Sequence, residues 1–190
     1  GAIGDLLLFS ANDGTHGTQL WQTTGTAGST VMVKDINTTS AGASSNHGDL
    51  TNVDGVLFFR AADGIHGAEL WKSDGTTAGT VLVLDINPGA ASSTPDNLIN
   101  GNGTLFFTAN DPATGVALWT SDGTADGTTL VADINPGTTS SFPQNPTAVG
   151  GRVFFTAVTP GVGRELWVSD GTAAGTALVS ELGEDPNDRG

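Results

Sequence analysis

Short apolar runs alternate with polar stretches along the whole chain. Residues 57–59 (LFF) form one such run, and residues 69–72 (ELWK) alternate polar with large apolar side chains. This period-two alternation is typical of a half-buried β-strand. Residues 80–86 predict a third strand, and residues 49–53 predict a shorter strand ahead of the other three. No window keeps helical periodicity beyond two turns, so the sequence predicts an all-β protein.

The same group of strands recurs four times. The tryptophans mark it best, since they stand 48 to 50 residues apart, at Trp21, Trp71, Trp119 and Trp167. Self-similarity at such a period is the signature of a repeat architecture. We therefore treat 1–190 as a single repeat domain, with repeats of about 48 residues at approximately 1–46, 47–94, 95–142 and 143–190.

A turn signal follows each tryptophan strand. The tetrapeptide SDGT occupies residues 73–76, 121–124 and 169–172, and the first repeat has TTGT at residues 23–26. Asp-Gly favours a hairpin, because glycine accepts a positive φ and the aspartate side chain bonds nearby backbone N–H groups. The sequence therefore predicts that each repeat is a series of antiparallel hairpins.

Tandem four-stranded antiparallel units with longer connections between them describe propeller blades. Stacking the blades buries the apolar faces that one blade leaves open. The sequence predicts a β-propeller with four tandem four-stranded blades. Two alternatives stay open: half of a larger propeller, and a β-solenoid, which the hairpin signals disfavour.

The tryptophan segment resembles a bacterial tandem-repeat family that is named for its ELWxxDGT motif. The motif stands at 69–76 and 165–172, and it is altered to ALWTSDGT at 117–124 and to QLWQTTGT at 19–26. The resemblance covers nearly the whole chain. It implies a secreted or cell-surface bacterial protein with many copies of the repeat, and it carries over no activity and no catalytic residue.

Charge narrows the range of partners. The chain has 20 acidic and 6 basic residues, which gives a formal net charge of −14. Such a surface repels nucleic-acid phosphates and anionic membranes but attracts divalent cations. There are no cysteines, and no apolar stretch has the length of a transmembrane helix. Neither nucleic acid nor membrane insertion is expected.

Calcium is the candidate ion, although no cofactor is firmly indicated. Calcium prefers several hard oxygen ligands near a sharp turn. One repeated set of carboxylates closes the third predicted strand, at Asp35, Asp85, Asp133 and Glu181. A second set lies in the turns, at Asp74, Asp122 and Asp170. The alternative reading is that these side chains bond turn backbone.

The tryptophans raise a second candidate chemistry. Trp21, Trp71, Trp119 and Trp167 have the chemistry to stack on sugar rings in a lectin-like site. One tryptophan at a fixed place in each blade also fits packing between blades, and that reading is favoured.

These observations favour a non-catalytic, extracellular or cell-surface structural or adhesive protein. Residues 2–4 supply only the end of a short first strand, so an open blade edge favours assembly with other copies of the chain. One alternative is a calcium-dependent carbohydrate-binding propeller that recognises surface glycans. The other is a propeller hydrolase or lyase, for which the chain shows no nucleophile motif.

Overall fold

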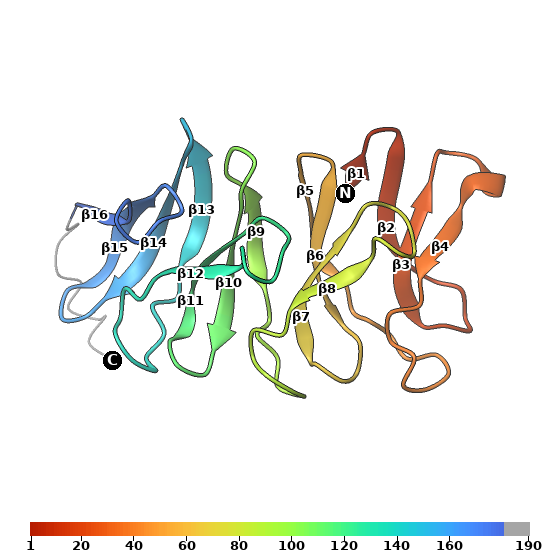
Figure 1. Ribbon diagram of the computed structural model, residues 1–190, viewed down its shortest axis with the longest axis horizontal. Coiled ribbons are helices and arrows are strands. Elements are labelled where there is room, and N and C mark those ends of the chain that lie inside the picture. Colours follow the sequence, from red (N-terminus) through yellow and green to blue (C-terminus); the bar gives the residue numbers. More distant parts are fainter. Residues whose placement is uncertain (181–190) are drawn as a thin grey trace.

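The computed structural model describes residues 1–180, which form four separate antiparallel sheets of four strands each (Figure 1). Within every sheet the strands lie in the order in which they follow along the chain. We call the sheets blades 1 to 4. Blade 1 comprises β1 (Ala2–Ile3), β2 (Leu6–Asn12), β3 (Thr18–Thr23) and β4 (Val31–Lys34); blade 2 comprises β5 (Gly48–Val53), β6 (Val56–Ala62), β7 (Ala68–Ser73) and β8 (Val81–Leu84). Blade 3 comprises β9 (Asp96–Asn100), β10 (Leu105–Asp111), β11 (Gly115–Ser121) and β12 (Thr129–Ala132); blade 4 comprises β13 (Gln144–Val149), β14 (Arg152–Thr159), β15 (Gly163–Ser169) and β16 (Ala177–Ser180).

Each blade is built around a central hairpin that pairs phenylalanine with tryptophan. Phe59 of β6 lies opposite Trp71 of β7, and Phe107 of β10 lies opposite Trp119 of β11. Large aromatic side chains opposite each other stabilise an antiparallel pair. A short 3₁₀ turn, η1 (Ala27–Ser29), follows the tryptophan strand of blade 1.

Neighbouring blades pack face to face. Successive side chains of a strand point to opposite sides of a sheet, so every blade has two apolar faces. We call the face toward the next blade the forward face and the opposite one the backward face. Leu8 and Leu20 on the forward face of blade 1 pack with Leu57 and Phe59 on the backward face of blade 2, and all four are fully buried. Equivalent clusters fill the junctions between blades 2 and 3 and between blades 3 and 4.

The first strand of each blade lies on the inner side of the arc. Strand β9 contacts both β5 and β13, the first strands of the blades on either side. The Asn52 side chain donates a hydrogen bond to the Ala2 carbonyl, and Asn100 donates one to the Asn52 carbonyl over 3.3 Å. The inner strands are thus tied together by side chain to backbone bonds.

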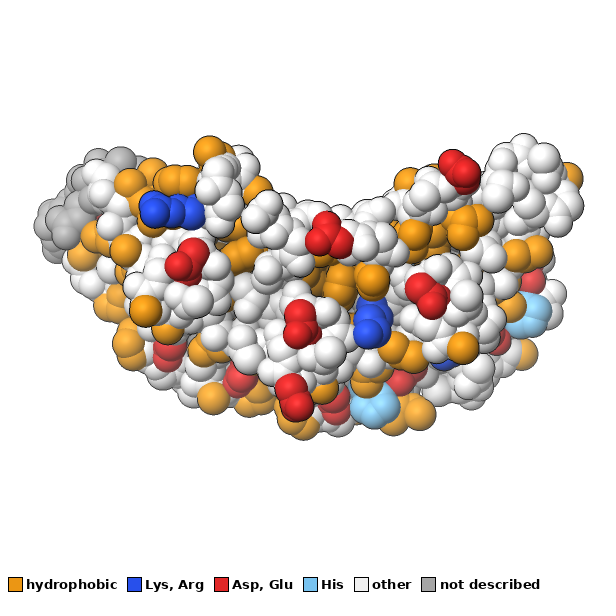
Figure 2. Space-filling model, turned by 45° about the horizontal axis from the view of Figure 1, so that its top comes forward, with side chains coloured by type: hydrophobic (Ala, Val, Ile, Leu, Met, Phe, Trp, Pro, Cys, Tyr) orange, Lys and Arg blue, Asp and Glu red, His pale blue; other side chains and the backbone are white. Residues whose placement is uncertain are grey.

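The four blades form an open arc rather than a closed ring. Blades 1 and 4 lie at opposite ends of the molecule in Figure 1, and the space-filling view has the outline of a crescent (Figure 2). Within residues 1–180, the three hydrophobic clusters each join consecutive blades, and none joins blade 4 to blade 1. The predicted architecture of four tandem four-stranded blades is confirmed, and the arc matches a segment of a larger propeller. All strand pairs within the blades are antiparallel, unlike the coils of a solenoid.

Candidate functional site

Three of the four tryptophans, Trp71, Trp119 and Trp167, lie in the packing between blades, and Trp21 occupies the equivalent place on the uncovered face of blade 1. Trp71 and Trp119 are only 6% and 7% exposed and belong to the hydrophobic clusters at the two junctions on the N-terminal side of their blades. Trp21 and Trp167 are half-buried, and the Trp167 indole N–H donates a hydrogen bond to Thr159 over 3.1 Å. The two inner tryptophans therefore have little surface left for a sugar ring. Stacking on a glycan stays a prediction for this set.

The turn aspartates each bond their own turn. Asp74 Oδ1 accepts hydrogen bonds from the Thr76 backbone N–H over 2.8 Å and from the Thr76 hydroxyl over 2.7 Å. The same pairs recur at Asp122 with Thr124 and at Asp170 with Thr172. The threonine hydroxyl and then the backbone N–H lower the pKa of each of these carboxyls. Hydrogen bonding within the turn is the alternative to calcium binding that the sequence left open for Asp74, Asp122 and Asp170.

The carboxylates at the end of the third expected strand occupy a different position. Asp85 and Asp133 accept hydrogen bonds from the backbone N–H groups of Gly89 and Gly137, over 3.0 and 3.1 Å. Asp35 is half-buried, and Glu181 lies outside the described residues. In the part of the chain that the structure describes, no three His, Asp or Glu side chains gather into a metal-binding group. Calcium binding stays a prediction for both sets.

The first residue of the ELW motif has a structural role that the sequence did not reveal. Glu69 is fully buried and accepts hydrogen bonds from the Ile86 N–H over 3.1 Å and from the Ser93 N–H over 2.7 Å; the Ser93 hydroxyl donates a further bond. Ser93 belongs to the segment that leads from blade 2 to blade 3. Its carbonyl accepts the Asn110 N–H, so the carboxylate fixes the connection between two blades.

A glutamine does the same work in blade 1. Gln19 is also fully buried, and its Oε1 accepts bonds from the Ile36 N–H over 3.1 Å and from the Ser45 hydroxyl over 2.7 Å. Burial raises the pKa of Glu69 even though the hydrogen bonds from Ser93 and Ile86 oppose that rise. In the sequence, Glu69 and Gln19 each stand directly before a core leucine. The alternation of polar and apolar residues does not by itself show whether such a polar side chain is exposed or buried.

A second cluster of polar side chains, formed by Asp49, Asp96 and Arg60, lies where the chain enters the inner strands of blades 2 and 3. Burial, followed by a hydrogen bond with Asp96, raises the pKa of Asp49. The Arg60 guanidinium lies 3.9 Å from Asp49 and donates a hydrogen bond to the Pro95 carbonyl over 3.2 Å. Asp49 thus holds its proton more readily than an isolated aspartate in water would.

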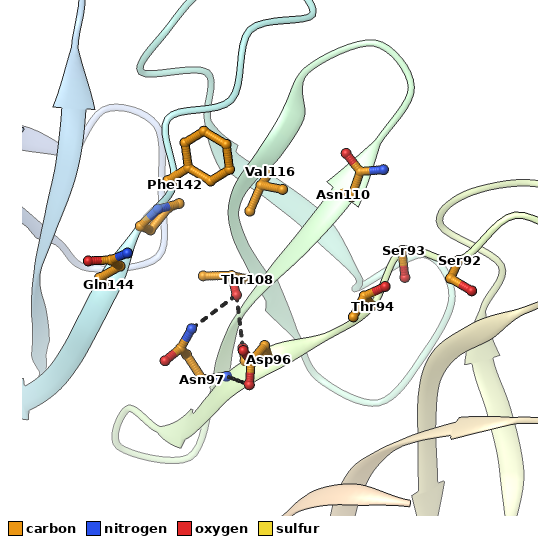
Figure 3. A pocket seen from close by; sticks show the side chains of 11 residues that line it. Ser92, Ser93, Thr94, Asp96, Asn97, Thr108, Asn110, Val116, Phe142 and Gln144 are labelled. Carbon is orange, nitrogen blue, oxygen red and sulfur yellow. Dashed lines mark hydrogen bonds between the residues drawn. The ribbon is translucent and has the colours of Figure 1, made fainter. Parts of the chain in front are cut away.

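A pocket opens beside this group, between the segments that connect blade 2 to blade 3 and blade 3 to blade 4. Its volume is about 420 Å³, within the range of small-molecule sites. Thr108 and Asn110 of β10 form its floor, and Asp96 and Asn97 lie on one side (Figure 3). Phe142 contributes an aromatic ring that is half exposed. The sequence interpretation assigned no role to any of these residues.

The two ends of the arc form a further candidate site, because within residues 1–180 no neighbouring blade lies against either of these inter-blade faces. On the backward face of blade 1, Leu7 is 50% exposed, whereas its equivalent in blade 2, Leu57, is 0% exposed. On the forward face of blade 4, Val179 is 46% exposed, whereas its equivalent in blade 3, Val131, is 2% exposed. The exposed faces therefore carry the side chain types that the internal junctions bury.

Fold and faces together define the class: this chain is a β-propeller segment built from one repeated blade. The crystal structure of puromycin hydrolase is similar over 95% of this chain and 28% of that one, with a TM-score of 0.62 and 15% identity. A candidate TolB protein from Agrobacterium tumefaciens is similar over 95% of this chain and 62% of that one, with a TM-score of 0.54 and 11% identity. At these identities the likeness shows the fold alone, and the chain spans less than two thirds of either structure. No protein family and no curated protein sequence matches the chain.

The relation to a membrane rests on one observation. Among the described residues, no helix is long and apolar enough to cross a bilayer.

Proposed function

We propose that this chain is a non-catalytic, extracellular structural module that joins to further copies of itself. The observation that carries the proposal is the pair of uncovered faces at the ends of the arc. They are complementary, because a backward face and a forward face meet at every internal junction. A head-to-tail contact between two chains would repeat that junction with side chains of similar type.

The exposed faces support assembly better than the blade edges do. The outer strands of the blades have four residues each, and short edge strands are a common device against edge pairing. By contrast, Leu7 is 50% exposed at the end of blade 1, beside the half-buried Phe9 and Trp21. Burying apolar surface stabilises an interface by about 25 cal/mol per Å². The faces are therefore the surfaces through which we expect copies to join.

A head-to-tail contact has a predictable symmetry. The two faces differ, so the interface is heterologous and leads either to a closed ring or to an open filament. Because the arc is curved, two copies are expected to close into one ring of eight blades. The surrounding charge also matters: at a net charge of −14 per chain, divalent cations should favour the association of two acidic chains.

The test is the molar mass in solution by light scattering, in calcium and again in EDTA. We expect twice the 19.1 kDa of one chain. Leu7→Lys on blade 1 and Val179→Lys on blade 4 should each yield smaller particles, and an equimolar mixture of the two variants should form a dimer through its one intact pair of faces. Ile65→Lys is the control, since Ile65 is 63% exposed on a loop of blade 2. A chain that stays monomeric at high concentration with and without calcium would refute the proposal.

A further inference from the structure

The pocket beside β9, β10 and β13 contains an aromatic side chain in an unfavourable backbone conformation. Phe142 has a φ of +44°, in the left-handed region where a bulky residue is an outlier. Its ring does not compensate by packing, because the residue is 50% exposed. Strain of this kind at a pocket indicates a functional constraint.

Phe142 also breaks the repeat. The equivalent residues in the preceding connections are Asn46 and Thr94, and both share the positive φ, at 50° and 49°. The backbone shape is therefore a property of every connection, and both equivalents are exposed and polar. Asparagine tolerates this conformation far better than phenylalanine does. Only the connection into blade 4 places an aromatic ring there, and that ring lies beside Val116 at the pocket (Figure 3).

Polar groups with spare bonding capacity line the rest of the pocket. Among residues 1–180, the side-chain amides of Asn110 and Gln144 make no hydrogen bond, and Asn97 uses only its Nδ2, which donates to Thr108 over 3.3 Å. Amides offer both donors and acceptors. Asp96 adds an acceptor on the same side, next to Asn97.

We propose that this pocket binds a neutral sugar unit. The Phe142 ring stacks on the apolar face of a pyranose, and Asn97, Asn110 and Gln144 hydrogen-bond its hydroxyl groups. A ring with one apolar face and many hydroxyls matches a pocket that has one exposed aromatic and several amides. Asp96 in the wall and the net charge of −14 disfavour anionic sugars and phosphates. This site is separate from the tryptophans and independent of the assembly faces.

The test begins with an array of immobilised glycans that end in glucose, galactose, mannose or N-acetylglucosamine, printed beside sialylated and phosphorylated ones. We expect retention on neutral glycans. The methyl glycoside of the best one is then titrated into the 190-residue chain and followed by NMR. Phe142→Asn, which installs the residue found at position 46, should weaken binding at least tenfold while circular dichroism shows a folded protein.

Two further variants make the result decisive. Ile65→Thr removes an exposed apolar side chain in blade 2 and installs the residue found at position 15, so it should leave binding unchanged. The double variant Asn110→Ala and Gln144→Ala leaves Phe142 in place and should also weaken binding. The proposal is overturned if no neutral glycan is retained, if only anionic glycans bind, or if Phe142→Asn and the double variant bind as well as the unaltered chain.

Discussion

The backward faces of blades 1 and 2 carry closely similar side chains in different surroundings. Leu57 and Phe59 of blade 2 are fully buried against blade 1, whereas Leu7 and Phe9 of blade 1 face no preceding blade and are exposed and half-buried. The difference shows that burial in this molecule depends on the adjacent blade and not on the blade itself. In a repeat protein of this kind, much of the stability of one blade comes from its interfaces with the neighbouring blades.

The largest expected effect tests this difference directly. Phe59→Ala leaves a cavity in the first junction and should lower the free energy of unfolding by about 3 to 5 kcal/mol. Phe9→Ala, at the equivalent, half-buried place on the uncovered face, should lower it by about 1 kcal/mol or less. Urea unfolding at low protein concentration, followed by circular dichroism, measures both. Equal losses would mean that the end of blade 1 is covered in solution.

The next largest effect concerns the connection between blades 2 and 3. Glu69→Ala leaves the Ile86 and Ser93 N–H groups without their acceptor, and it should lower the free energy of unfolding by about 2 to 4 kcal/mol. Gln19→Ala removes the equivalent acceptor in blade 1 and should give a similar loss, since that junction is also internal. A harmless Glu69→Ala would contradict the role that we assign to the carboxyl.

The Glu69→Gln variant separates charge from hydrogen bonding. Because burial raises the pKa of Glu69 above its ordinary value of 4.5, the folded protein holds that proton more tightly than the unfolded chain does. The unaltered protein should therefore lose stability as the pH rises from 4.5 through the higher pKa of the folded state. Glu69→Gln should lack that loss. Parallel pH profiles for the two proteins would rule out this linkage.

A smaller effect comes from the turn glycines. Gly25 and Gly123 have similar positive φ values, 95° and 88°, so alanine at either should cost about 1 kcal/mol through backbone strain. At Gly123 a Cβ would also lie 3.1 Å from the Phe58 ring of the preceding blade, whereas at Gly25 no atom of the described chain lies within 4 Å. Gly123→Ala should therefore lose about 1 to 2 kcal/mol more. Thermal unfolding of both variants measures the difference, and equal midpoints would argue against this contact.

The smallest effect lies at the inner strands. Asp49→Asn installs the residue that blades 3 and 4 carry at the same place, Asn97 and Asn145, where φ is likewise positive. Burial and Asp96 raise the pKa of Asp49, so the ionised form destabilises the fold as the pH rises above the ordinary value. The variant should gain up to about 1 kcal/mol at neutral pH, and the gain should vanish in acid. A loss at neutral pH would show that the Arg60 contact dominates instead.

Much of the fold was predictable because its signals are local. Alternation around Trp71 predicted β7, and the Asp-Gly turn after it predicted the hairpin to β8. The expected third strand, residues 80–86, is shorter in the structure, where β8 spans Val81–Leu84. Its last residues, Asp85 and Ile86, leave the ladder so that the Ile86 N–H meets Glu69.

The candidate sites were harder to predict because they depend on residues from different repeats. Thr94, Thr108 and Gln144 belong to the second, third and fourth repeats, and they line one pocket only because the connections on both sides of blade 3 pass close to β10. The positive φ shared by Asn46, Thr94 and Phe142 follows no glycine signal. Comparison of the repeats identifies residues that recur, whereas the aromatic side chain of this pocket, Phe142, has no aromatic equivalent in the other connections.

The sequence by itself determined the blade: the order of its strands, the hairpin turns and the two apolar faces all follow from periodicity and turn chemistry within about 48 residues. Only the tertiary structure decided that the four blades leave an arc open, that Glu69 is a buried acceptor, and which apolar faces stay exposed. The physical reason is that these properties depend on the angle and contacts between blades. Equivalent side chains, such as Leu7 and Leu57, are exposed or buried according to whether another blade lies against them.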